Sequence, residues 1–290
     1  MKASAALLAC ALFLASPAAA QDWAGVDAAL GRTGAEQPGG VHRYGFPRSD
    51  LSVTLDGVAL KPALALGSWL AFQQTPGGAR VMGDLVLLDR EVNPVMSQLL
   101  AGGLTVTALH NHLLGAAPAT FYMHIHGHGD PVALARAVRA ALSLTATPLA
   151  PPAAAAPAPL ALDTAALDRL LGAAGKANGG VYQYGFPRPE PIEEGGVPVP
   201  PAMGLATAIN FQPTGPGRAA TTGDFVLRAE EVTPVMKALR EGGIEVTALH
   251  NHLGDERPRL FFMHFWGKGE PAALAATLRK ALDRIGKARG

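Results

Sequence analysis

Six of the nine histidines in this 290-residue chain fall into one pattern that occurs twice. Each occurrence is a His-Asn-His run with a third histidine in the next apolar segment, giving His110, His112 and His124, then His250, His252 and His264. Side chains two residues apart in a strand share a face, so the paired imidazoles lie about 7 Å apart at the backbone. Three imidazoles suit a transition metal and leave a fourth position for water or substrate. The pattern predicts a metal site in each set, with Zn or Cu favoured.

A structural interpretation competes with this one, because a lone His-x-His pair at a strand end is more often a hydrogen-bonding surface feature. The third histidine favours metal. Phe261, Met263 and Phe265 form an apolar row, which leaves His264 on the opposite face of its strand. If that strand returns antiparallel, His264 joins the other two imidazoles. The repetition of the set adds less, since a duplicated copy inherits residues whether or not it uses them.

Carboxylates near the histidines are candidates for proton transfer or for completing a metal shell. Glu231 precedes Thr233-Pro234, which we expect to begin a helix, and Asp224 follows a glycine at a strand. Either could act as a general base on metal-bound water, and each could equally be a turn or capping residue. Their counterparts in the first copy are Glu91 and Asp84.

These residues belong to a sequence unit that occurs twice in the chain, and a repeat this long indicates duplication of a whole domain. VTALHNHL recurs unchanged at 106–113 and 246–253, and YGFPR recurs at 44–48 and 184–188. Arg48 and Arg188, the arginines that end the two YGFPR runs, could bind an anion, but a structural ion pair is the expected role. We predict domains at 22–144 and 160–286, joined by a Pro/Ala-rich linker at 145–159.

Each unit alternates short strands with single helices, which predicts an α+β domain with a mostly antiparallel sheet covered by helices. In the second unit we expect strands near 181–186, 206–212, 222–227, 245–252 and 260–266, and a final helix near 271–285. This arrangement places the histidine strands beside each other.

The composition limits which partners and which location are expected for this protein. Lys+Arg 24 against Asp+Glu 23 gives a net charge of +1, so nucleic acid is not an expected partner.

Residues 1–20 have a basic start, a short apolar run and small residues before a cleavage point, which is typical of a secretory signal peptide. We expect a periplasmic or secreted mature protein with no membrane-spanning segment, and Cys10, the single cysteine, is removed with the signal.

At these motifs the sequence resembles the LppY/LpqO-like family, also called DUF1259. The resemblance rests on YGFPR, GD(F/L)VL, EVxPVM, ALHNH and FMH in the second copy, and it extends over both units. The family is secreted or lipid-anchored and has no assigned activity. The resemblance therefore implies location and kinship without implying a reaction.

The sequence favours an exported two-domain protein that binds or handles a transition metal. One alternative is a metal-dependent, zinc-type hydrolase or lyase in which Glu231 or Asp224 moves a proton. A second alternative is a metal-free protein whose histidines and aromatics line a groove for a small-molecule ligand. Whether the chain is an enzyme stays open at this stage.

Overall fold

The computed structural model describes residues 23–151 and 159–286, and within them each repeat folds as a six-stranded antiparallel sheet with helices. The expected signal peptide at 1–20 and residues 152–158 of the expected linker lie outside the described residues. The α+β class and the tandem arrangement are confirmed.

The first domain contains four helices, α1 to α4, among its described residues. Its elements in chain order are α1 (Ala24–Leu30), β1 (Ala35–Gln37), β2 (Val41–Pro47), β3 (Thr54–Leu55), β4 (Val58–Ala59), α2 (Pro62–Ala65), β5 (Gly67–Thr75), β6 (Gly78–Leu88), α3 (Asp89–Ala101), β7 (Thr105–His110), β8 (Thr120–Gly129) and α4 (Pro131–Leu142). Its main sheet has the order β1-β2-β5-β6-β8-β7.

The second domain repeats this series with a 3₁₀ turn in place of α2, and its elements are α5 (Thr164–Leu171), β9 (Lys176–Asn178), β10 (Val181–Pro187), β11 (Glu193–Glu194), β12 (Val197–Pro198), η1 (Pro201–Met203), β13 (Ala206–Gly215), β14 (Arg218–Leu227), α6 (Ala229–Glu241), β15 (Glu245–His250), β16 (Phe261–Gly269) and α7 (Pro271–Leu282). Its sheet has the equivalent order β9-β10-β13-β14-β16-β15.

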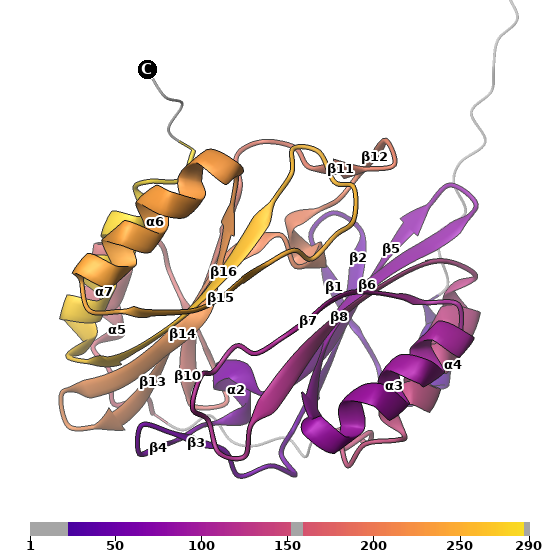
Figure 1. The fold of residues 1–290 in the computed structure, drawn as a ribbon, viewed down its shortest axis with the longest axis horizontal. Coiled ribbons are helices and arrows are strands. Elements are labelled where there is room, and N and C mark those ends of the chain that lie inside the picture. The colour runs from indigo at the N-terminus through magenta and orange to yellow at the C-terminus, as the bar shows by residue number, and fades with distance from the viewer. Residues whose placement is uncertain (1–22, 152–158, 287–290) are drawn as a thin grey trace, which may run out of the picture.

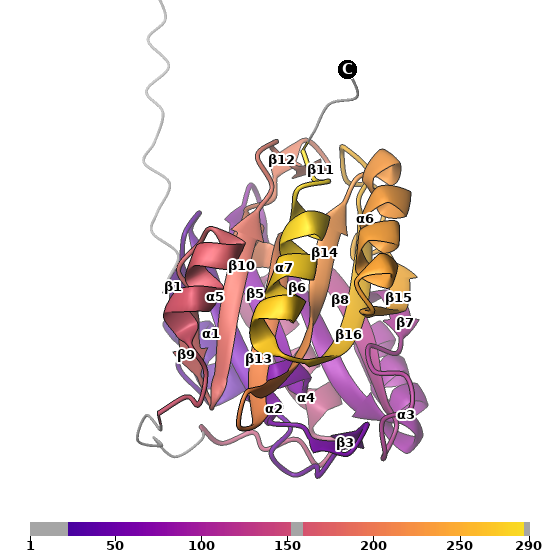
Figure 2. The ribbon, with the colours of Figure 1, turned by 90° about the vertical axis from the view of Figure 1, so that its left-hand side faces the viewer.

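The two sheets face each other in the middle of the molecule, and the long helices cover their outer faces (Figure 1). Helices α5, α6 and α7 flank one side, and α3 and α4 flank the other (Figures 1 and 2). Alternation along each strand divides the side chains between these layers. Met263 and Phe265 pack under the helices of their own domain, whereas Phe262 and Trp266 lie in apolar clusters that contain residues of both domains.

Helix α6 begins earlier than the sequence predicted. Thr233-Pro234 was expected at its start, but the helix begins at Ala229 and contains Pro234. The reason is Glu231, the third residue of the helix, whose carboxylate accepts the backbone N–H of Arg228 and so caps the first turn. Helix α3 repeats this arrangement with Glu91 and Leu88.

Among the described residues, no helix is both long and apolar enough to span a bilayer.

Candidate metal centre

The hairpin of β15 and β16 brings together the three histidines of the second domain, and β7 and β8 do the same in the first. His264 pairs in register with Asp224 on β14 and with Ala248 on β15, while His250 pairs with Phe262. A bulge in β15 between Val246 and Ala248 sets this register. The histidines therefore lie on the inner face of the sheet, toward the other domain.

The inner faces bring the two histidine sets into one cluster. The ring centroids of His110 and His250 are 3.5 Å apart, and those of His112 and His264 are also 3.5 Å apart. His124 and His252 are separated by 3.8 Å. We call these six side chains the histidine centre. The sequence predicted the members of each set, but it did not predict that the sets meet across the domain interface.

Four groups of donors within this region could hold a metal ion. Ligand atoms within each group lie within 4.8 Å of one another, and the groups are His110, His112, His250 and His264; His124, His250 and His252; Asp84, His112 and His124; and Asp224, His252 and His264. None of the four contains all three histidines of one domain. Asp84 and Asp224 complete the last two groups, so the aspartates weighed from the sequence do lie at the centre.

The imidazole nitrogens of the centre lack protein partners. The Nε2 atom of each of the six histidines is buried and has no hydrogen-bond partner among the described residues. An unsatisfied buried polar group costs about 1 to 3 kcal/mol. Six such atoms in one region are therefore available to a ligand.

Hydrogen bonds on the opposite ring atoms direct some of these nitrogens inward. His264 places Nδ1 3.0 Å from the carbonyl oxygen of Gly223, and His124 has the equivalent backbone contact with Gly83. A ring whose Nδ1–H donates to a carbonyl presents the lone pair of Nε2 to a ligand. The glycines permit this contact because a Cβ at Gly223 would overlap the carbonyl oxygen of Ala208 on the neighbouring strand.

In the absence of an ion, burial favours the neutral form of both the histidines and the aspartates. Burial, with the nearby His250, lowers the pKa of His110 to about 3, and burial lowers the pKa of His250 to about 4. Burial raises the pKa of Asp84 to about 7, although Arg43 opposes this. Burial and the charge of Asp84 together raise the pKa of Asp224 well above its usual range. Neutral imidazole is the form that binds metal.

Glu231, the other predicted proton-transfer residue, lies in a different network. Arg188 donates through Nη1 and Nη2 to the two carboxylate oxygens of Glu231, at 2.8 and 3.1 Å. The backbone N–H of Arg228 and that of Gly286 also bind this carboxylate. Although burial would raise the pKa of Glu231, the bond to Arg188 holds it below its usual value. The expected structural ion pair of this arginine is therefore present, and both carboxylate oxygens are occupied.

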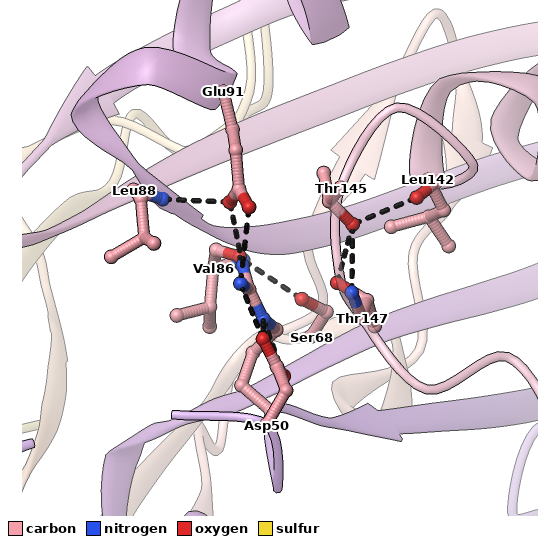
Figure 3. A network of polar contacts seen from close by, with 9 residues as sticks. Asp50, Ser68, Val86, Leu88, Glu91, Leu142, Thr145 and Thr147 are labelled. Atoms are coloured by element: carbon pink, nitrogen blue, oxygen red, sulfur yellow. Dashed lines mark hydrogen bonds and ion pairs between the residues drawn. The ribbon is translucent and has the colours of Figure 1, made fainter. Parts of the chain in front are cut away.

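The first domain repeats this network. Glu91 accepts the backbone N–H of Leu88 and lies above Asp50 in Figure 3. The fully buried Arg48 joins the two carboxylates, with 2.8 Å to Glu91 and 2.9 Å to Asp50. Neither glutamate belongs to the four donor groups.

His126 and Glu194 form a contact between the domains that the sequence did not reveal. The Nε2 atom of His126 lies 2.9 Å from Oε2 of Glu194, and Nε of Arg80 lies 3.2 Å from the same oxygen. The only signal in the sequence was that His126 stands where the second copy has Trp266. The partner could not be named, since the two residues are far apart in the chain.

The fold and the site together define a class of protein. Its members have two α+β domains whose sheets face each other, with a histidine cluster between the sheets that could hold a metal ion. A family model described as Domain of Unknown Function (DUF1259) matches residues 24–144 and again residues 165–284. The chain belongs to this family, in two tandem copies. The expected membership in DUF1259 is confirmed, while the description does not carry the name LppY or LpqO.

Other comparisons add little. No curated protein matches the chain. Among solved structures, the trimeric bacterial microcompartment shell protein PduB is 15% identical over 86% of this chain and 89% of its own, with a TM-score of 0.22. EtuB from Clostridium kluyveri is 12% identical over 86% and 90%, with a TM-score of 0.20. Likeness at these TM-scores carries no argument about this protein.

Proposed function

We propose that this protein binds transition-metal ions at the histidine centre between its two domains. The observation that supports the proposal most is the set of six buried Nε2 atoms without protein partners. Zn or Cu is the favoured ion, because imidazole nitrogen suits both, with Cu(II) ahead in the general affinity order. Since the N-terminal segment is typical of a secretory signal, we place this activity in the periplasm or outside the cell.

The test is metal binding by chelator-stripped protein, measured by calorimetry with Zn(II) and Cu(II) and by elemental analysis after dialysis. We expect high-affinity uptake by the wild type. Replacing His112 and His252 together by Asn should weaken uptake by at least about 100-fold, because each belongs to two of the four donor groups, one of which contains an aspartate. The matched control is His128→Asn, since His128 is exposed and outside the groups. Absence of uptake by the wild type would refute the proposal.

A second candidate function, a metal-dependent hydrolase or lyase, is favoured by one specific observation. A cavity of about 880 Å³ is lined by His250 together with His126, His128 and Arg80. In the equivalent place on the other side, Trp266 fills space and donates a hydrogen bond to Asp56 at 2.7 Å. A small molecule could therefore reach the centre from one side.

The experiment for this candidate is a screen of ester, phosphate and amide substrates with stripped and metal-reloaded protein. Turnover that returns with the metal and is lost in His250→Asn would support the enzyme. Metal binding with no turnover on any substrate would leave the metal-binding module as the function.

A further inference from the structure

Each domain contains one triad of an aspartate and two histidines, and the two triads are equivalent by the repeat. Asp84, His112 and His124 form the first, and Asp224, His252 and His264 form the second. We propose that the centre holds two divalent metal ions, one in each triad. This rests on the proposed function and adds the aspartates as ligands.

Distances within the triads support the proposal. Asp84 Oδ2 lies 3.8 Å from Nε2 of His112 and 3.9 Å from Nε2 of His124. Asp224 lies 3.5 Å from Nε2 of His252 through Oδ2 and 3.8 Å from Nε2 of His264 through Oδ1. These separations are too long for hydrogen bonds. Ligands about 2.0 to 2.1 Å from a tetrahedral ion lie about 3.4 Å apart, so the triads are close to coordination spacing.

Several atoms of the triads have no protein partner. Oδ1 of Asp84, Oδ1 of Asp224 and the four Nε2 atoms of the triads are buried without hydrogen-bond partners among the described residues. Asp224 also accepts a backbone hydrogen bond from Met263, and its Oδ1 atom has no partner of its own. The side chain of Asp84 is 8% exposed and that of Asp224 is 14% exposed. A buried carboxylate needs a compensating charge. A divalent ion between the three donors supplies it.

Ring geometry disfavours the alternative, a single ion held by four histidines. That group contains the stacked pairs His110 with His250 and His112 with His264, with interplanar angles of 27° and 23°. An imidazole nitrogen coordinates through a lone pair in the ring plane, so two rings stacked face to face direct their lone pairs side by side and not at one point. In the first triad, the rings of His112 and His124 are instead 6.4 Å apart and tilted by 35°.

Two imidazoles and one carboxylate leave open coordination positions, as in catalytic zinc sites and non-haem iron sites. The ligand set therefore suits Zn(II), an ion that the proposed function also favours. His110 and His250 stack on each other and belong to neither triad.

The experiment is a titration of stripped full-length protein with Zn(II), with stoichiometry taken from calorimetry and elemental analysis, and a parallel titration with Co(II) followed by visible absorption. We expect two ions per chain. Asp84→Asn and Asp224→Asn should each weaken the binding of one ion by at least about 100-fold and leave the binding of the other ion unchanged. The double variant should bind neither ion. Asp255→Asn, at an exposed position near the centre, is the matched control.

A further variant separates the two arrangements. His110→Asn with His250→Asn should still bind two ions if the triads are the sites, but should lose binding if four histidines hold one ion. One ion per chain in the wild type, or two ions unaffected by both aspartate variants, would overturn the triad assignment while the proposed function stands. No ion at all would overturn both. Circular dichroism of each variant establishes that it is folded.

Discussion

Glu231 caps the first turn of α6 and pairs with the buried Arg188. From the sequence it was a candidate proton acceptor beside the histidines. In the structure its carboxylate is bound by Arg188 and by two backbone N–H groups. The arginine is in turn held by Glu190 and by the carbonyl oxygen of Val226. The group is a cap and an ion-pair partner whose oxygens are not free.

We therefore expect Glu231→Gln to reduce stability without reducing metal content. Removing one charge of a buried ion pair costs up to about 3 to 5 kcal/mol, and here Arg188 keeps Glu190 as a partner, so we expect the lower part of this range. Chemical denaturation gives the loss in the free energy of unfolding, and elemental analysis gives the metal. Glu230→Gln, whose partner Arg228 is half-exposed, is the control and should change stability by less than about 1 kcal/mol. Loss of metal with unchanged stability would instead indicate that Glu231 acts at the histidine centre.

At the scale of elements, the strand pair β13–β14 shows why a glycine precedes each aspartate of the centre. Gly223 lies opposite Ile209 and beside Phe265, and its carbonyl oxygen is the partner of His264. A side chain there would meet the backbone of Ala208. The strands can approach closely and orient the histidine only if this position has no Cβ.

Gly223→Ala should therefore destabilise the protein by about 3 kcal/mol or more, at or above the usual cost of overpacking. It should also weaken metal binding, because the strand must shift at Asp224. Gly185→Ala is a matched control on β10, where an added Cβ would meet no heavy atom within 4 Å. Thermal melting and Zn(II) titration measure both effects. Equal melting temperatures for the two variants would contradict this account.

At the scale of the whole molecule, the two domains share buried apolar surface. One cluster joins Val86 and Tyr122 of the first domain to Trp266 of the second, and another joins Met82 to Phe262 and Leu260. Polar contacts also cross the interface, including Gln212 with the backbone of Lys61 at 2.8 Å. Although the sequence predicts a Pro/Ala-rich linker between the two domains, their sheets cover each other.

Residues 22–151 and 159–286 produced as two separate chains should therefore associate. We expect them to copurify as a 1:1 complex that binds metal, and each alone to aggregate or melt at lower temperature, because its inner sheet face is exposed. Size-exclusion chromatography with light scattering measures the association. Two stable monomers that do not interact would show that the shared clusters contribute little.

The six buried histidines also give the whole molecule a pH dependence in the metal-free form. Burial lowers the pKa of all six, to about 3 for His110 and about 4 for His250. Below a pH of about 6.5 the unfolded chain binds protons that the folded chain does not. The free energy of unfolding therefore decreases as the pH is lowered, by about 1.4 kcal/mol per pH unit for each histidine.

The raised pKa values of Asp84 and Asp224 act in the opposite direction, but they are two groups against six. We expect stripped protein to lose stability continuously from pH about 6.5 to about 4.5, as measured by urea denaturation at a series of pH values. Asparagine at both His112 and His252 should flatten the slope. A stability that is constant over this range would contradict the burial of the centre.

Much of this protein could be predicted from its sequence because the information is local or repeated. Alternation of apolar residues places Met263 and His264 on opposite faces, and the recurrence of VTALHNHL establishes the duplication. Both follow from the period of the strand and from comparison of the chain with itself. The α+β class, the members of the histidine sets and the structural role of Arg188 all came from such patterns.

Only the tertiary structure decided that the two histidine sets form one centre. Within one repeat, the inner face of the sheet carries Phe262 and His264 and has no partner, and periodicity cannot state what covers it. In the fold, the other copy of the same face covers it, so His112 contacts His264 and Asp224 is affected by the charge of Asp84. Packing of two distant segments depends on the shape of whole surfaces, which no local pattern in the chain encodes.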